Sequence, residues 1–208
     1  MTRLVVAGTD TDVGKTVFAA GLVQALNATY WKPVQAGLDD GTDTLTVQDL
    51  ARQGNDRIIP EVYRLGSPLS PHRAAEIDNV LIDTDRLTLP EVDGPLVIEG
   101  AGGLLVPLTR EVLYADLIAR WSLPVVLVGR TALGAINHAL LSIEAMRSRG
   151  IRIIGIAFVG DEITDTQRTI AQMGKIRQLG RLPILDPLNA ASLQAAFDEA
   201  FNLDDFQL

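Results

Sequence analysis

The feature that most constrains this chain is a loop, GTDTDVGKT at 8–16, that joins an apolar strand to a helix. The strand is predicted from the apolar run LVVA at 4–7, and the helix from apolar residues that recur at helical spacing from Lys15 to about Asn27. Loop N–H groups and a helix N-terminus form a cradle for phosphate, in which Lys15 reaches the β- and γ-phosphates and the Thr16 hydroxyl can bind Mg²⁺. This order of elements predicts a nucleotide-binding protein.

The loop departs from the usual phosphate-binding pattern in one respect. Five residues separate Gly8 from Gly14, whereas the usual pattern has four between its glycines, and Thr9 stands at the expected glycine position. An ordinary strand-to-helix turn that contains Gly-Lys-Thr is the alternative interpretation. The flanking strand and helix favour the phosphate loop, because they are the context that the motif requires.

Strands and helices alternate along the rest of the chain. Further strands are predicted at 30–34, 95–99, 123–128, 151–158 and 181–185, and further helices at 135–149, 165–179 and 190–201. Segment 36–92 is less regular, and we expect short helices there as an elaboration of the same domain. Apolar strands that alternate with helices indicate a parallel sheet covered on both faces. The 208 residues predict a single P-loop NTPase-like α/β domain over 1–208, with a mostly parallel twisted sheet and helices on both faces.

Composition excludes several classes of protein. The chain has 26 acidic and 18 basic residues, a formal net charge of −8, which disfavours binding to nucleic acid. The absence of cysteine excludes disulfides and cysteine-ligated metals. No apolar run approaches the ~18 residues of a membrane span, and the short run after Met1 is no signal-peptide core, so we expect a cytoplasmic protein. Only three residues are lysine, namely Lys15, Lys32 and Lys175, and we expect no functional role for Lys175, which falls on a predicted helix.

Two acidic residues are candidates for holding a metal. Glu99 follows the apolar residues at 96–98, and a carboxylate that ends a buried strand is costly unless it is paired or bound to a metal. Ligands of parallel sheets bind beyond the carboxyl ends of the strands, although a solvated acid at a strand end is the alternative. Asp43 is the weaker candidate, because it belongs to an acidic cluster that is most often simply solvated: Asp39, Asp40, Asp43 and Asp49.

The segment KPVQAG at 32–37 leads out of the predicted strand at 30–34, whose carboxyl end is expected at the edge of the sheet where ligands bind. A lysine there could neutralise a phosphoryl or carboxylate group. We therefore expect Lys15 and Lys32 to converge on one anion, with an unremarkable surface lysine as the alternative.

Five segments together resemble the dethiobiotin synthetases of biotin synthesis. They occur in that family's order: GTDTDVGKT at 8–16, KPVQAG at 32–37, SPHRAA at 70–75, EGAGGLLVPL at 99–108 and LGAINHALL at 133–141. The resemblance implies that one amine of 7,8-diaminononanoate takes up CO₂ to form a carbamate, which ATP phosphorylates to a mixed anhydride. The second amine then closes the ureido ring, and the products are dethiobiotin, ADP and phosphate. Such chemistry depends mostly on positioning and electrostatics.

The resemblance also implies roles for individual residues. Lys15 and Lys32 are the implied catalytic residues, and Mg²⁺ is implied at Thr16, Asp43 and Glu99. Nucleotide contacts are implied for Asp12, Val13, Gly14, Lys15, Thr16, Val17, Asp43, Glu99, Pro183, Ile184 and Leu185. Substrate contacts are implied for Thr11, Lys32, Ala36, Gly102, Gly134 and Asn137. The last two lie at a helix start that, in the family, receives the substrate carboxylate from the neighbouring subunit, so a homodimer is implied.

Two positions depart from the family's pattern. Ala36 stands where Ser or Thr is usual, which leaves only its backbone near the substrate. Val159 stands where an Asn commonly pairs with the adenine, and a valine cannot pair with a base edge. We therefore hypothesise a looser or altered base preference. His72 and His138, the only histidines, are expected to make structural hydrogen bonds rather than bind a metal.

Two other functions share the phosphate loop and the sheet. One is an amidoligase of cobalamin synthesis, although such chains normally carry a glutaminase domain with a catalytic cysteine. The other is a partitioning or septum-positioning ATPase, although those proteins usually have a further lysine early in the loop, where this chain has Asp10. The combined motifs favour the synthetase.

Overall fold

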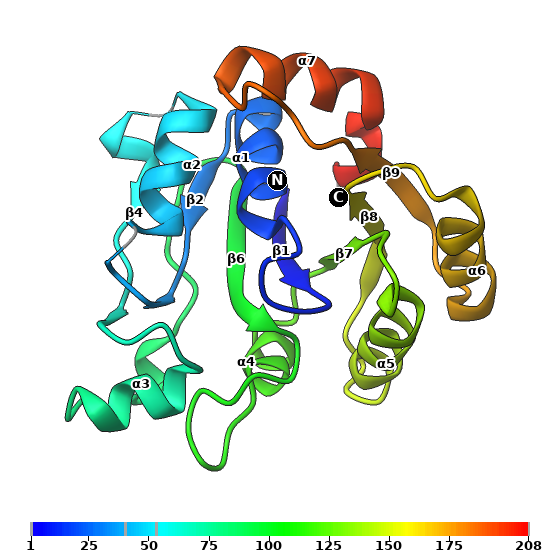
Figure 1. The fold of residues 1–208 in the computed structure, drawn as a ribbon. Coiled ribbons are helices and arrows are strands. Elements are labelled where there is room, and N and C mark those ends of the chain that lie inside the picture. Colours follow the sequence, from blue (N-terminus) through cyan, green and yellow to red (C-terminus); the bar gives the residue numbers. More distant parts are fainter. Residues whose placement is uncertain (1, 40, 53, 208) are drawn as a thin grey trace.

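The computed structural model describes residues 2–39, 41–52 and 54–207, in which strands and helices alternate (Figure 1). The strands are β1 (Arg3–Gly8), β2 (Thr29–Trp31), β3 (Val34–Ala36), β4 (Ile58–Ile59), β5 (Tyr63–Leu65), β6 (Leu96–Gly103), β7 (Val125–Arg130), β8 (Ile153–Val159) and β9 (Gln178–Leu182). The α-helices are α1 (Lys15–Leu26), α2 (Asp43–Ala51), α3 (Pro71–Ile77), α4 (Tyr114–Trp121), α5 (Ala135–Arg147), α6 (Thr164–Gly174) and α7 (Ala190–Ala200).

Seven strands form one sheet in the order β4-β2-β6-β1-β7-β8-β9, and every neighbouring pair in it is parallel. The short strands β3 and β5 form a separate parallel pair. Because the strands are parallel, the loops that follow β1, β2 and β6 emerge at one edge of the sheet, side by side. The predicted fold class is confirmed.

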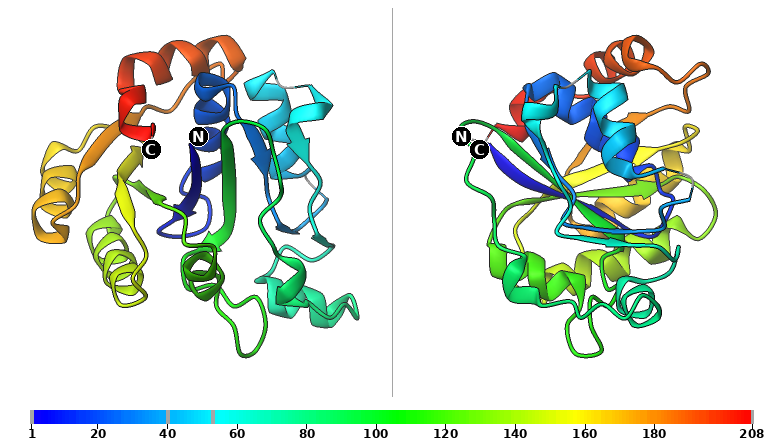
Figure 2. Two further views of the ribbon diagram at one scale, coloured as in Figure 1. Left: turned by 180° about the vertical axis from the view of Figure 1, so that it is seen from behind. Right: turned by 90° about the vertical axis from the view of Figure 1, so that its left-hand side faces the viewer.

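The two faces of the sheet are covered by different helices, as the right-hand view of Figure 2 shows. Alternate residues of β1 face opposite ways: Leu4 and Val6 pack in the core under α1, α2 and α7, whereas Val5 and Ala7 pack in the core with α3, α4, α5 and α6. On β6, Val97 faces α1 and α2 and Ile98 faces the other side. The period of two in a strand therefore turns Glu99 toward α1 and α2.

Three predicted boundaries were wrong. The expected strand at 30–34 is two strands, β2 and β3, separated at Lys32 and Pro33, because a proline has no N–H to continue the pairing. The expected helix at 165–179 ends at Gly174, where Lys175 takes a left-handed conformation with φ of 45°. The chain then pairs with β8 from Gln178, so the last strand spans 178–182 rather than 181–185.

Two further features were not foreseen. Helix α4 buries Tyr114, Leu117, Ile118 and Trp121, whose helical spacing would have predicted it. Strand β6 does not end at Glu99 but continues to Gly103. Its pairing with β1 is irregular beyond Glu99, since β6 advances by four residues while β1 advances by two. Glu99 therefore lies inside the strand, with no exposed surface.

Candidate active site

The phosphate loop meets α1 without a capping side chain. Gly14 takes a left-handed conformation with φ of 86°, which favours glycine, and as the N-cap of α1 it has no side chain to accept a hydrogen bond from the first turn. The N-terminal N–H groups of α1 are thus left for an anion, and the helix dipole favours negative charge there. Lys15 is buried, and its Nζ donates to the Asp10 carbonyl oxygen at 3.0 Å. The loop has the form of the predicted phosphate cradle.

Three oxygen-bearing side chains converge beside this loop. The Thr16 Oγ1 atom lies 2.9 Å from Asp43 Oδ1 and 2.9 Å from Glu99 Oε1. Thr16 comes from the first turn of α1, Asp43 from the first turn of α2, and Glu99 from the middle of β6. Thr42 begins α2 as its N-cap, since its side chain accepts from the Leu45 N–H at 3.2 Å, and this fixes where Asp43 sits. The three residues predicted to hold the metal are therefore together.

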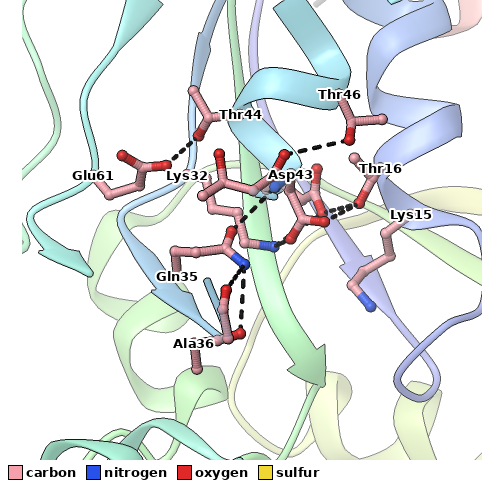
Figure 3. Close-up of polar contacts among 12 residues, drawn as sticks. Lys15, Thr16, Lys32, Gln35, Ala36, Asp43, Thr44, Thr46 and Glu61 are labelled. Carbon is pink, nitrogen blue, oxygen red and sulfur yellow. Dashed lines mark hydrogen bonds and ion pairs between the residues drawn. The ribbon is translucent and has the colours of Figure 1, made fainter. Parts of the chain in front are cut away.

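Lys32 lies between the two carboxylates. Its Nζ forms ion pairs with Asp43 Oδ2 and with Glu99 Oε1, the latter at 3.1 Å, and Figure 3 shows Lys32 pointing toward Asp43 and Thr16. Lys32 is 3% exposed, so the alternative of a surface lysine was wrong. Pro33, the next residue, cannot continue the pairing of β2. Lys32 therefore lies just beyond the end of β2, at the edge of the sheet where the cavity opens.

The buried charges alter one another's pKa values. For Lys32, burial acts to lower the pKa, but the carboxylates of Glu99 and Asp43 outweigh it and raise the pKa overall. For Asp43, burial acts to raise the pKa, and Lys32 outweighs it, so the pKa is lowered. Burial lowers the pKa of Lys15 against the raising effect of Glu99. The ion pair between Lys32 and Asp43 is therefore retained at neutral pH.

The donor set of this cluster fits a magnesium ion bound with phosphate. It offers two carboxylates and a hydroxyl, all hard oxygen donors, and a magnesium site completed by phosphate needs no more than one or two carboxylates. Among residues 2–39, 41–52 and 54–207, no group of three or more His, Asp or Glu side chains forms a self-sufficient metal site. Asp40 of the acidic loop lies outside the described residues. These donors would hold Mg²⁺ only together with substrate oxygens.

Two residues that sequence reasoning missed support the carboxylates from behind. The Tyr30 hydroxyl donates to Glu99 Oε2 at 2.9 Å. The Gln35 side chain accepts from the Asp43 N–H at 3.3 Å and donates to the carbonyls of Ala36 and Gly37, as Figure 3 shows in part. Gln35 belongs to the KPVQAG segment, which marked it without giving it a role, and the sequence carried no signal for Tyr30 except its place two residues before Lys32.

A cavity of about 910 Å³ opens over the cluster. Thr11, Ala36 and Gly102 line it together with Lys15, Thr16, Lys32, Asp43 and Glu99, so the predicted substrate residues from this part of the chain are brought together. Gly102 has φ of 61°, and a Cβ there would lie 2.8 Å from Val106 Cγ2 and 3.5 Å from Thr11 Oγ1. A side chain at position 102 would therefore be strained and would crowd the cavity.

The remaining two predicted substrate residues lie apart from this cavity within one chain. Gly134 precedes α5 with φ of 90° and lines a separate cavity of about 130 Å³, together with Thr11 and His138. Asn137 is exposed on the first turn of α5. Both residues are placed at the surface near the phosphate loop rather than inside the polar cavity.

A third cavity, of about 440 Å³, lies on the other side of the phosphate loop. Asp12, Val13, Gly14 and Val17 of the loop and α1 line it, and so do Pro183, Ile184 and Leu185, so these predicted nucleotide-binding residues surround one cavity. Val159, the last residue of β8, lies in its wall, and a Cβ on Gly14 would meet its Cγ1 at 2.7 Å. Arg130 also lines it and donates two hydrogen bonds to the Asp12 carbonyl, through Nε at 2.8 Å and through Nη2.

Both histidines lie beside a polar side chain. His72 Nδ1 is in hydrogen-bond contact with Ser70 Oγ at 3.0 Å, and His138 Nδ1 lies 3.2 Å from Asp10 Oδ2, an ion-pair distance. The contact of His72 fits the expectation of a structural hydrogen bond. No helix in the described part of the chain has both the length and the apolar character that crossing a membrane would require.

A parallel sheet with a phosphate loop after its central strand β1 defines a P-loop protein that binds nucleoside triphosphates. A family model described as an AAA domain matches residues 2–192. Solved structures share the fold at low sequence identity. A ParA family ATPase from Chlorobium tepidum aligns with a TM-score of 0.52 at 13% identity, covering 95% of this chain and 91% of that one. The cell division ATPase MinD from Pyrococcus furiosus aligns at 0.53 and 14%, covering 96% and 98%.

The chain belongs to the dethiobiotin synthetase family. It is 60% identical to the ATP-dependent dethiobiotin synthetase BioD of Rhodopseudomonas palustris strain BisB18, over 98% of each chain. It is 58% identical to that of Nitrobacter hamburgensis, over 99% of this chain and 97% of that one, and 58% identical to that of Novosphingobium aromaticivorans, over 99% and 100%. The partitioning and septum-positioning ATPases are related to it by fold alone.

Proposed function

We propose that this chain is an ATP-dependent enzyme that closes the ureido ring of dethiobiotin from 7,8-diaminononanoate, CO₂ and ATP. One observation carries the proposal: Lys15, Thr16, Lys32, Asp43 and Glu99 converge in one cavity at the start of α1. Family membership at 58% to 60% identity over nearly the whole chain supports the same reaction. We also propose that residues 1–208 act as one domain and that the enzyme works in the cytoplasm, where ATP is supplied.

The reaction needs positioned charges more than a strong base. An amine nitrogen attacks CO₂ and loses a proton, which gives the carbamate. A carbamate oxygen attacks the γ-phosphorus, and the bond from phosphorus to the ADP oxygen breaks. The second amine attacks the carbamoyl carbon and loses a proton while phosphate leaves, which closes the ring. Negative charge is transferred at each of the last two steps, so fixed cations are the useful groups.

Lys15 and Lys32 supply those cations. Lys15 lies at the phosphate cradle, where its ammonium would leave the Asp10 carbonyl for the β- and γ-phosphate oxygens. Lys32 lies across the cavity among the carboxylates, from where it would face the carbamate and the transferring phosphoryl group. Their burial strengthens both interactions, because little water screens the charges.

We propose that Thr16, Asp43 and Glu99 hold Mg²⁺ together with ATP. The ion would neutralise developing charge on the phosphate oxygens. Thr16 lies within 2.9 Å of both carboxylates, and this closeness of three oxygen donors supports the assignment. The apolar cavity lined by Pro183, Ile184 and Leu185 would take the base of the nucleotide.

We propose that Thr11, Ala36 and Gly102 contact the diamine substrate, and that the enzyme is a homodimer in which Gly134 and Asn137 serve the site of the partner. Three exposed leucines support an interface around α5. Leu133 precedes the helix, Leu141 lies on it, and Leu105 lies beside it. The uncapped start of α5 suits a carboxylate. The site of one chain would thereby be completed by the other.

Mixing two inactive variants tests the shared site. In a dimer of Lys15→Ala with Asn137→Ala, one site combines an intact phosphate loop with an intact α5 from the partner. An equal mixture of exchanging subunits should therefore regain roughly a quarter of wild-type activity. A mixture as inactive as its components, with exchange verified by mass, would show that each chain uses its own α5 or none.

The overall activity is tested directly. Purified protein is supplied with diaminononanoate, bicarbonate and MgATP, and dethiobiotin is followed by mass together with ADP. We expect one ADP for each dethiobiotin. ATP turnover without dethiobiotin would refute the proposed reaction and favour a nucleotide-dependent switch.

A further inference from the structure

We propose that Tyr30 is a positioning residue that fixes the carboxylate of Glu99 for catalysis. The inference rests on the proposed role of Glu99 in holding the metal. Tyr30 is not among the residues that line the cavity over Lys32, Asp43 and Glu99, so we expect its effect on the reaction to pass through Glu99.

The two oxygens of Glu99 have different partners. Oε1 faces the reaction side, where it lies 2.9 Å from Thr16 Oγ1 and 3.1 Å from Lys32 Nζ. Oε2 faces away from that side and accepts from the Tyr30 hydroxyl at 2.9 Å. Because Glu99 has no exposed surface, water cannot replace this donor, and Tyr30 holds the carboxylate so that Oε1 is presented to the site.

The fold fixes Tyr30 as firmly as it fixes Glu99. Tyr30 is fully buried in β2, and its backbone is in register with Val97 of β6, two residues before Glu99. Both side chains point to the face covered by α1 and α2, so the long tyrosine reaches along the sheet to the carboxylate.

The three tyrosines of the chain provide a matched comparison. All three are buried, but their hydroxyls differ: that of Tyr30 bonds Glu99, and that of Tyr63 bonds the Asp83 backbone at 2.9 and 3.2 Å. In the described part of the chain, the Tyr114 hydroxyl has no hydrogen-bond partner. Tyr63→Phe therefore removes a buried, bonded hydroxyl outside the site, and Tyr114→Phe removes an unbonded one.

The experiment measures how strongly magnesium enhances nucleotide binding. Affinity for a non-hydrolysable ATP analogue is determined by calorimetry with Mg²⁺ and with EDTA, and the ratio of the two is the magnesium enhancement. We expect Tyr30→Phe to reduce this enhancement and kcat by about 10- to 100-fold, the usual effect of removing a partner of a metal ligand. We expect Tyr63→Phe and Tyr114→Phe to leave both unchanged, even where thermal stability falls.

The outcomes separate this inference from the proposed function. If Glu99→Gln leaves the magnesium enhancement as in the wild type, Glu99 is not a metal ligand. The proposed role of Glu99 and the positioning role of Tyr30 are then both refuted. If Glu99→Gln lowers the enhancement and Tyr30→Phe does not, only the role of Tyr30 is overturned. In the Glu99→Gln background, Tyr30→Phe should cause no further loss.

A second variant decides the matter if Tyr30→Phe does not fold. The hydroxyl would then be needed because the buried Oε2 atom of Glu99 loses its hydrogen-bond donor without it. In that case the double variant Tyr30→Phe/Glu99→Gln should recover the fold. A double variant as unstable as Tyr30→Phe alone would show that Tyr30 serves packing only.

Discussion

The two large cavities beside the phosphate loop are built in opposite ways. Part of the wall of the cavity over Lys32, Asp43 and Glu99 consists of charged and polar side chains that are tied to one another by short contacts, and Leu69, Pro71 and Val106 also line it. The cavity beyond Gly14 is walled mainly by apolar side chains, namely Val13, Val17, Val159, Ile163, Leu182, Pro183, Ile184, Leu185 and Leu188. The two cavities share the lining residues Asp12, Gly14 and Val17, so a single nucleotide could span both cavities.

The difference separates the residues proposed to act in the reaction from those proposed to recognise the nucleotide base. Charges in the polar cavity are held by several partners each, and moving one disturbs the others, so substitutions there should be costly and non-additive. The apolar cavity would accept the proposed nucleotide base by shape, and shape discriminates weakly between similar rings. Substitutions in the two cavities test the two sides of this contrast.

The largest effect is expected for Lys15→Ala. Removing the cation at the phosphate cradle takes away charge stabilisation during phosphoryl transfer, and kcat should fall by on the order of 10³-fold. The measurement is single-turnover formation of ADP with saturating diamine. A variant with near-normal turnover would remove Lys15 from the site, and Lys175→Ala, a lysine at the end of α6, serves as the control.

A smaller but still large effect is expected for Glu99→Gln and Asp43→Asn. Each keeps the shape of the side chain but removes a charge that pairs with Lys32 and faces the proposed metal. Activity should fall by about 10- to 100-fold and be partly restored by raised Mg²⁺. Activity that does not depend on either carboxylate would contradict the proposed metal site. Asp39→Asn, in the same acidic loop but exposed, is the matched control.

The effect expected for the choice of nucleotide base is smaller than the effects of these substitutions. With Val159 in the cavity wall, no side-chain amide is available there to pair with adenine, so ATP, GTP and CTP should differ by about tenfold or less in kcat/KM. Val159→Asn, of similar size, should increase the preference for ATP. A strong ATP preference in the wild type would show that backbone groups near Pro183 and Leu185 suffice to read the base.

The smallest effect is expected for an ion cluster outside both cavities. Hydrogen bonds from Arg110 and Arg73 lower the pKa of Glu76 to about 2, although these side chains are exposed. A depressed carboxyl pKa stabilises the fold above the ordinary pKa of 4.5 and loses that effect as pH falls toward 2. Glu76→Gln should therefore destabilise slightly at neutral pH and less near pH ~3. Urea unfolding at low and high salt measures this, and an effect insensitive to both salt and pH would contradict it.

Much of the fold could be predicted from local pattern. The central strands and the helices α1, α5 and α7 follow from apolar runs and helical periodicity, and the phosphate loop follows from its motif. The boundaries around Lys175 and Pro33 could not be placed, because they depend on one left-handed residue and on which neighbour a short strand pairs with. Helix α4 carried a usable signal in its apolar spacing.

The site was predictable where a motif marks it and not where only packing does. Lys15, Thr16, Lys32, Asp43 and Glu99 lie together as expected, since parallel strands bring their ends to one edge. Tyr30 carried no signal, because its hydroxyl reaches Glu99 only through the register of β2 on β6. A buried tyrosine in a strand is otherwise simply a core residue.

The strand order determines when the parts of the site come together during folding. Strand β6 lies between β2 and β1, and it joins residues far apart in the chain: Glu99 is 83 residues from Thr16 and 67 from Lys32. Contacts of such long range are slow to form, because the intervening chain must first be ordered. A nascent chain that has made β1 and β2 has both lysines and the phosphate loop, yet nothing holds them in register. Strand β6 supplies Glu99 and also joins β2 to β1, so the two lysines and the proposed metal-holding residues come together only when β6 has paired with both strands.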